Sequence, residues 1–395
     1  IFILGKDLVN KKAALVGAFL MSIFYLNIFY SNRILINIIE LSIGLILLTL
    51  FYSGYVKRKK ENYLLPLFPL TIIGFGIRFT VLVYLGIIII FLLATKGVNA
   101  FKIKKLNYSF LIALAIAIPA LIILYLKGVN PISSFLYAIK GTTPYSGLYK
   151  IPGLMKSYLG LIYTSFSWYL FIPLIIGAIA CLKFLLVLDK ILFKNLAEYQ
   201  EKIFLSIWFI IAFLFYGGII DLFDDRYFMM AFPCLFLICG MGFEEIFSYI
   251  KKNSKYLSLI VVILLLAAGG YLMLSHSNQI VQVKLYSYDS LKEAGTWIKD
   301  NSVPGDNIIT SATPEITYYS ERSTFHYPDN QSDFLKLLQE KKPKYLILTV
   351  WERSPEWAYN LIPTSQDFAP VKAFTSHDFP PEQPTAIIYQ LKNMV

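Results

Sequence analysis

The chain has 395 residues, of which 57% are hydrophobic and only 15% are charged, and its formal net charge is +11. A soluble protein has about 45–50% apolar and ~25% charged residues, so the composition indicates a membrane protein. The lysines stand in short polar segments beside apolar runs, which favours an anionic membrane surface over nucleic acid as their partner. Cys181, Cys234 and Cys239 lie in apolar runs, so neither a disulfide framework nor a cysteine metal site is expected.

Seven apolar stretches are long enough to cross a bilayer as helices, for which about 20 residues suffice. They are 13–30, 34–54, 108–126, 164–188, 203–221, 227–247 and 256–274. Residues 1–4 resemble the end of an earlier span, so the chain is expected to lack the N-terminal spans of a longer protein. These stretches together define a predicted transmembrane domain over 1–277.

Segment 64–95 differs from the others because it is too long for one span and too short for two full ones. Basic residues flank it on both sides, so we expect a hairpin of two short helices with both ends cytoplasmic. Arg78, which follows Gly74 and Gly76, then lies deep in the membrane or across it, where a charge is expensive and usually has a partner or a wet cavity. The alternative is an arginine that reaches water at the outer interface.

The polar breaks between the apolar stretches alternate between short breaks dense in lysine and breaks where lysine is sparser. The basic breaks contain Lys6, Lys11 and Lys12; Lys57, Arg58, Lys59 and Lys60; Lys96, Lys102, Lys104 and Lys105; Lys190, Lys194 and Lys202; and Lys251, Lys252 and Lys255. Short basic loops stay on the cytoplasmic side, so this alternation predicts the orientation of the chain. The outer face is expected to hold Arg33, the loop 127–157, the corner 224–227 and the tail after His276.

Residues 278–395 have the composition of a soluble protein. The hydrophobic patterns predict helices at 286–300 and 332–340, and strands at 307–312, 344–350, 371–376 and 385–391. We therefore expect a small extracytoplasmic α/β domain. His276, His326 and His377 are far apart in the sequence and are expected at the surface rather than in a metal site.

The residues left for chemistry are charges at the membrane edge. They are Arg33, Arg78 and Arg226 together with Glu40, Asp221, Asp224 and Asp225. The planar, permanently charged fork of arginine suits phosphate oxygens, and the membrane setting suits a phosphate carried on a lipid. The alternative for Asp224, Asp225 and Arg226 is a solvated turn with a local ion pair.

Several short motifs resemble those of membrane glycosyltransferases with the GT-C fold, in particular dolichyl-phosphate-mannose protein mannosyltransferases and lipid A aminoarabinose transferases. Asp225, Arg226, Tyr227 and Pro233 resemble the Arg-Tyr-x(n)-Pro element of that superfamily. Segments 4–15 and 27–33 resemble its cytoplasmic and outer turns, and 74–78 resembles its Gly-x-x-x-x-Lys hairpin, with Arg78 in place of lysine. The motifs keep the order and the membrane sides of the family.

The resemblance implies roles for individual residues. Arg226, Arg78 and Tyr227 would bind the donor phosphate, and the polar residues of the cavity would include Arg33, Asn37, Glu40, Asp224 and Asp225. The acidic catalytic base of the family would lie before Ile1. Relatives carry Asp at the position of Asn37, so either Glu40 takes over on the same helical face or, as we expect, Asn37 only hydrogen-bonds.

The resemblance predicts an α-helical polytopic membrane protein that works as an inverting glycosyltransferase. It would move a mannose-like sugar from a dolichyl- or polyprenyl-phosphate donor to a protein, lipid or glycan acceptor on the outer face. No cofactor and no metal site are implied, and a requirement for a divalent cation stays open. One rival is a transporter or flippase of polyprenyl-linked sugars, although only one broken segment is visible and inverted repeats would supply two. Another is a membrane-anchored protein whose outer domain binds a partner, which leaves Arg78 unexplained.

Overall fold

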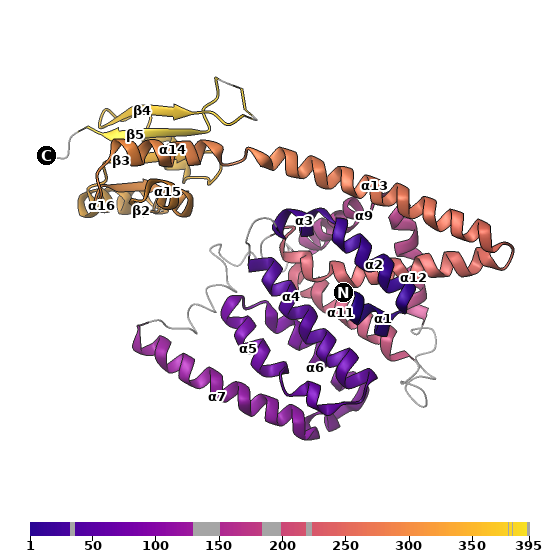
Figure 1. Cartoon of the computed structure of the whole chain (residues 1–395). Helices are drawn as coiled ribbons and strands as arrows, with labels where there is room; N and C mark the ends of the chain where they lie inside the picture. Colours follow the sequence, from indigo (N-terminus) through magenta and orange to yellow (C-terminus); the bar gives the residue numbers. More distant parts are fainter. Residues whose placement is uncertain are drawn as a thin grey trace. The chain divides into compact units, whose positions relative to one another are not determined.

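The computed structural model describes residues 1–31, 36–128, 151–183, 199–218, 223–377, 379–380 and 382–392. The chain forms two compact units, Ile1–Asn278 and Gln279–Val395. The boundary between them falls within the long helix α13 (Figure 1).

The first unit is built from helices rich in apolar residues (Figure 1). They are α1 (Phe2–Leu8), α2 (Lys11–Ile23), α3 (Tyr25–Ser31), α4 (Ile36–Thr49), α5 (Leu67–Ile77), α6 (Val81–Lys96), α7 (Lys104–Leu126), α9 (Ile151–Leu182), α11 (Gln200–Gly218), α12 (Phe232–Lys251) and α13 (Lys255–Leu285). Within the described residues, seven helical segments are long and apolar enough to cross a membrane, or eight if a bent pair counts as one span. The chain is therefore a multi-pass membrane protein.

Two of the expected spans differ in detail from the structure. The stretch 13–30 is not one straight helix, because α2 and α3 meet at Phe24 with a bend of 55°. In segment 64–95, the second helix is longer than the predicted short arm. It continues through the 3-10 helix η3 (Gly97–Lys102), and together they form the 22-residue candidate span Val81–Lys102.

Helix α12 lies at the centre of the first unit, where small residues allow close backbone contacts. A Cβ atom on Gly242 would lie 1.8 Å from the Pro173 carbonyl oxygen of α9, and one on Gly240 would lie 2.2 Å from the Ala13 carbonyl oxygen of α2. Any larger residue at these two positions would force the helices apart. Small residues at crossings are the usual means of tight helix packing in membranes.

Helices α4, α5 and α6 run in alternating directions. Thr80 at the start of α6 contacts Glu40 near the start of α4. The π-helical segment η1 (Leu50–Lys57) continues α4 in one candidate span. The end of α6 lies beside η1, because Lys96 donates a hydrogen bond to the Tyr55 hydroxyl. The intervening α5 therefore runs antiparallel to both, and its turn into α6 brings Arg78 beside α4.

The second unit is a five-stranded sheet covered by helices on both faces. The strands are β1 (Asn307–Thr310), β2 (Ser323–Phe325), β3 (Tyr345–Thr349), β4 (Phe368–Phe374) and β5 (Ala386–Leu391), and the helices are α14 (Asp289–Asn301), α15 (Thr313–Ser320), α16 (Gln331–Lys341) and α17 (Glu356–Leu361). The order is β2-β1-β3-β5-β4, with β2, β1 and β3 parallel and β5 antiparallel to both of its neighbours. One face packs on residues of α14 and α15, and the other on residues of α16 and α17.

The predicted helices and strands of this unit are present within a few residues of their expected bounds. The pattern did not predict α15, β2 or α17. β2 has only 3 residues and lies at the sheet edge with no buried position, and α17 has only 6. Elements of that length carry too little hydrophobic periodicity to be recognised.

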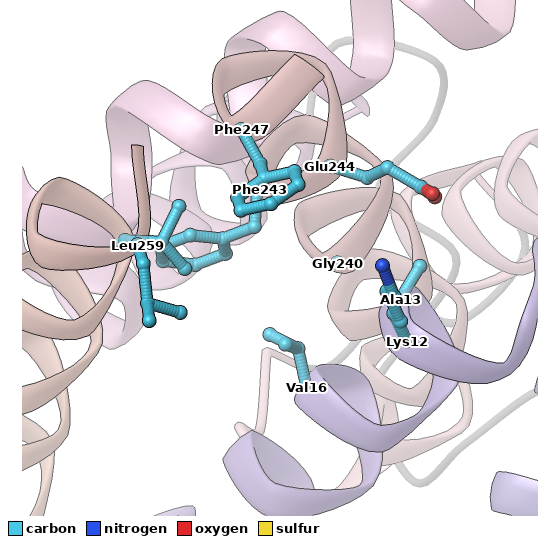
Figure 2. A pocket seen from close by; sticks show the side chains of 9 residues that line it. Lys12, Ala13, Val16, Gly240, Phe243, Glu244, Phe247 and Leu259 are labelled. Atoms are coloured by element: carbon cyan, nitrogen blue, oxygen red, sulfur yellow. The ribbon is translucent and has the colours of Figure 1, made fainter. Parts of the chain in front are cut away.

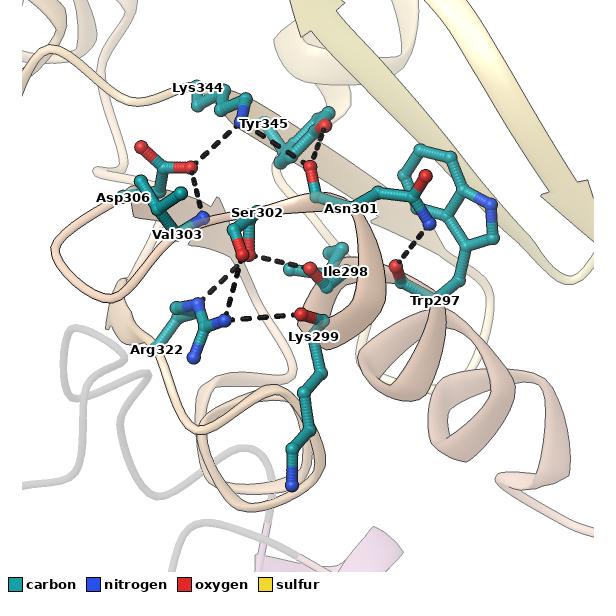
Figure 3. Close-up of polar contacts among 10 residues, drawn as sticks. All are labelled: Trp297, Ile298, Lys299, Asn301, Ser302, Val303, Asp306, Arg322, Lys344 and Tyr345. Atoms are coloured by element: carbon teal, nitrogen blue, oxygen red, sulfur yellow. Dashed lines mark hydrogen bonds and ion pairs between the residues drawn. The ribbon is translucent and has the colours of Figure 1, made fainter.

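The C-terminal end of α14 is held by side chains from two other segments (Figure 3). Arg322, which is buried, donates to the carbonyl oxygens of Lys299 at 3.1 Å and Ser302 at 2.9 Å. Tyr345 donates to the Asn301 carbonyl at 2.9 Å. These donors satisfy carbonyls that a helix end leaves without intrahelical partners.

Candidate functional site

Three segments far apart in the sequence bring the predicted site residues together in the first unit. Helix α4 supplies Asn37 and Glu40 from its first turns, and the turn between α5 and α6 supplies Arg78. The segment between α11 and α12, including the 3-10 helix η7 (Tyr227–Met230), supplies Arg226 and Tyr227. We call these five residues, with Asp224, the arginine cluster.

Arg78 and Glu40 form a buried ion pair. The Arg78 Nη1 atom lies 3.2 Å from Glu40 Oε2, and only 17% and 6% of the two side chains are exposed. Thr80 donates a hydrogen bond to the other carboxylate oxygen at 2.5 Å, and the Tyr216 hydroxyl of α11 also bonds to Glu40. An unpaired charge among apolar helices is costly, so these partners explain how both charges persist there.

Tyr227 links the two arginines. Its ring lies 4.9 Å from the Arg78 guanidinium carbon and 5.5 Å from that of Arg226. On α11, Tyr216 stacks nearly parallel to it, with 6.4 Å between ring centroids and 8° between planes. A guanidinium over an aromatic face is held by the ring quadrupole, so the ring brings two positive charges to one place.

Arg226 is fixed by the acidic residue two positions before it. Its Nε atom lies 2.6 Å from Asp224 Oδ2, and its backbone N–H donates to Asp224 Oδ1 at 3.0 Å. This local ion pair is the one that the alternative interpretation predicted. The side chain nevertheless also contacts Tyr227, and 38% of it stays exposed, so the turn is not merely solvated.

Asp225 and Asn37 tie this turn to neighbouring helices. Tyr30 of α3 donates a hydrogen bond to Asp225 Oδ1 at 3.1 Å. Burial, followed by the adjacent Asp224 carboxylate, raises the pKa of Asp225 above its ordinary value. Asn37 Nδ2 donates to the Arg226 carbonyl oxygen at 3.4 Å, which is the hydrogen-bonding geometry expected of an asparagine here. Glu40 is occupied by Arg78 and Thr80, so it is poorly placed to replace a general base.

The arginine cluster thus gathers Arg78, Arg226, Tyr227, Asn37, Glu40 and Asp224, with Asp225 beside it. Arg33, Asp221 and most of the loop 127–157 lie outside the described residues. Within the residues that are described, no group of three or more His, Cys, Asp or Glu side chains could hold a metal ion.

Three further residues at the site, Thr80, Tyr216 and Tyr30, were not predicted from the sequence. Thr80 and Tyr216 stand in apolar segments without any recognisable motif, and their part in the site follows only from the α4, α6 and α11 packing. Tyr30 had a weak signal, because tyrosines are enriched at membrane interfaces and it lies in the motif 27–33.

Comparison with solved structures finds a similar fold in ArnT from Cupriavidus metallidurans. The structure of ArnT bound to undecaprenyl phosphate matches with a TM-score of 0.58, and the apo structure with 0.59. Each match covers 98% of this chain and 80% of ArnT, at 11% sequence identity. The chain has a GT-C type fold.

The predicted fold class is thereby confirmed, as a GT-C type helical membrane protein with a small C-terminal α/β domain. No protein-family model and no curated protein matches the sequence. The low identity means that the likeness lies in the arrangement of the backbone, and the roles of the cluster residues rest on their own geometry.

Proposed function

We propose that this chain is an inverting glycosyltransferase that uses a sugar carried on a polyprenyl phosphate. Arg78, Arg226 and Tyr227 bind the phosphate of the donor. The observation that carries the proposal is the convergence of two guanidinium groups on the Tyr227 ring. Two fixed cations beside a phenol, at the end of apolar helices, fit an anion that is attached to a lipid.

Two further observations support this proposal. The ArnT structure with the same fold is bound to undecaprenyl phosphate, a polyprenyl phosphate. The two arginines also differ in exposure, because 17% of the Arg78 side chain and 38% of the Arg226 side chain are accessible to solvent. Arg78 would act as a fixed inner charge, and Arg226 would contact the phosphate from the more accessible side.

The proposed reaction is a displacement at the anomeric carbon of the sugar. The acceptor hydroxyl gives its proton to an acidic side chain, as the family resemblance implies, and its oxygen attacks the anomeric carbon. The bond between that carbon and the phosphate oxygen breaks, and its electron pair leaves with the phosphate. Arg78 and Arg226 stabilise the negative charge that develops there, since preorganised cations act most strongly where charge appears.

The proposed donor is a mannose-like sugar on a dolichyl or related carrier. The proposed acceptor lies on the outer face. They rest on the motif resemblance and on the charge of the loops. Glu40, Asn37 and Asp224 position the arginines in this scheme, because each bonds to Arg78 or Arg226.

The test is transfer of radiolabelled sugar by the full-length protein, with dolichyl-phosphate mannose first in a panel of donors. Arg226→Ala should lower turnover about 10²–10³-fold, which is typical for loss of one preorganised donor. Arg226→Lys should recover part of the activity, because the ammonium keeps the charge without the fork.

Arg353→Ala is the matched control, since Arg353 is a surface arginine with 81% of its side chain exposed. Undiminished transfer by Arg226→Ala at matched expression would rule out the role of this residue. Movement of intact donor across the membrane without cleavage would instead identify a transporter.

A further inference from the structure

A cavity of about 210 Å³ lies between α2, α12 and α13 (Figure 2). It is lined at Gly240 and Glu244 of α12, whose N-terminal end at Phe232 is close to the cluster. From Phe232 to Glu244 the helix rises about 18 Å, at about 1.5 Å per residue. The cavity is therefore near the opposite end of the helices.

The lining is almost wholly apolar. Ala13 and Val16 come from α2, Phe243 and Phe247 from α12, and Leu259 from α13 (Figure 2). All three helices belong to candidate membrane spans. A hollow of this lining in a membrane-spanning helix bundle suits a hydrocarbon chain, because its walls are formed mainly by apolar side chains.

Two lysines stand beside this apolar hollow. Lys12 Nζ lies 5.3 Å and Lys251 Nζ lies 6.0 Å from the centre of the Phe247 ring. Neither lysine forms an ion pair with any residue that the structure describes. Glu244 is the nearby carboxylate of the lining, and it accepts a hydrogen bond from the Asn10 side chain, which also caps the start of α2. The lysines therefore supply positive charge that Glu244 does not pair.

We propose that this cavity binds an anionic phospholipid of the bilayer. One acyl chain enters the apolar hollow, and the phosphate lies against Lys12 and Lys251. The volume is below the 300–1,000 Å³ of pockets that enclose whole drug-sized ligands, so it takes part of one chain and the rest of the lipid stays in the bilayer. The charge of the loops places the lysines, and hence this lipid, in the cytoplasmic leaflet.

The experiment is native mass spectrometry of the full chain released from micelles with equal amounts of phosphatidylglycerol and phosphatidylcholine. Wild type should retain phosphatidylglycerol preferentially. Lys12→Gln and Lys251→Gln should each weaken that retention about fivefold, as expected for one lysine at a membrane surface. Val16→Phe should fill the hollow and reduce retention with both lysines intact.

Lys202→Gln is the matched control, because Lys202 also contacts an aromatic ring, that of Tyr199 at 5.8 Å, but does not line the cavity. Lys12 is exposed, so its replacement leaves the packing unchanged even if Val16→Phe fails to fold. Equal retention of the two lipids, or an equal loss in Lys202→Gln, would overturn the proposal. Preferential retention of added undecaprenyl phosphate in this hollow would also overturn it, whatever the sugar-transfer assay shows.

Discussion

Glu40 determines where the Arg78 guanidinium lies, because the two side chains are paired among buried residues. Thr80 and Tyr216 hold the carboxylate from two further helices, so the position of Arg78 depends on α4, α6 and α11 together. Arg226 is held differently, by Asp224 two residues away. One arginine is thus placed by tertiary packing and the other by a local turn.

We predict that Glu40→Gln destabilises the protein strongly and that a phosphate ligand restores part of the loss. Removal of one partner from a buried pair typically costs about 3–5 kcal/mol, because a buried charge is left without compensation. Polyprenyl phosphate would supply a new anion for Arg78. The midpoint of thermal unfolding of the full chain, with and without this lipid, measures both effects.

Glu201→Gln is the control for this prediction. Glu201 also pairs with a cation, Lys57, but the two side chains are 27% and 41% exposed. Exposed pairs contribute little, so its unfolding midpoint should change only slightly. If Glu40→Gln and Glu201→Gln have the same midpoint, or if the lipid shifts them equally, Arg78 does not depend on Glu40 in this way.

At the scale of elements, the end of α14 illustrates how charge and helix termini act together in the second unit (Figure 3). Lys344 Nζ lies 2.9 Å from Asp306 Oδ2 and donates to the Asn301 carbonyl at 3.3 Å. Partial burial raises the pKa of Asp306, but the hydrogen bonds from Lys344 and the Val303 N–H, together with the nearby positive charges, outweigh it and the pKa is lowered. A carboxyl group whose pKa is lowered by folding stabilises the folded state at any pH above its pKa in the unfolded chain. This contribution is lost as the pH falls through its pKa in the folded protein.

We therefore predict that the end of α14 loosens in acid. Protection of its amides against hydrogen exchange in the full chain should fall as pH is lowered below about 4, the ordinary range for aspartate. Asp306→Asn should show lower protection at neutral pH and a flatter pH dependence, after correction for the intrinsic exchange rate. Parallel pH profiles for the two proteins would contradict the assignment to Asp306.

The helices and strands also show which features of the structure the sequence could predict and which it could not. Long apolar runs predicted the membrane spans, and buried strands such as β3 were recognisable as continuous hydrophobic runs. Together with the short motifs, these signals were enough to predict the fold class. The bend at Phe24 and the extension of α6 through η3 could not be predicted. No proline or glycine adjoins the bend, and Gly97, with φ +57° at the end of α6, indicates a helix end rather than a continuation. Arg78 and Arg226 were recognisable as rare charges, but Thr80 and Tyr216 become site residues only through contacts between distant helices.

At the scale of the whole molecule, the orientation in the membrane is still a prediction from the loop charges. It places the unit Gln279–Val395 on the outer face and both ends of the α5–α6 segment on the cytoplasmic face. A reporter on the second unit must be accessible, and Ser320 is unsuitable because it is buried. The neighbouring Tyr318 is 76% exposed.

We predict that Tyr318→Cys reacts with a membrane-impermeant maleimide in intact cells. The three natural cysteines Cys181, Cys234 and Cys239 are buried, so wild type supplies the background. A cysteine at Lys251, on the predicted cytoplasmic side, should react only after the membrane is permeabilised. The reverse pattern would invert the whole topology, and with it the outer placement of the arginine cluster.

The contact of two guanidinium groups with one Tyr227 ring has a consequence for the end of the proposed catalytic cycle. The donor is a phosphodiester with one negative charge, whereas the spent carrier is a monoester with about −1.5 to −2 at pH 7. Two fixed cations hold the more highly charged species more tightly. The spent carrier would then leave more slowly than unreacted donor, and accumulated carrier would inhibit further turnover.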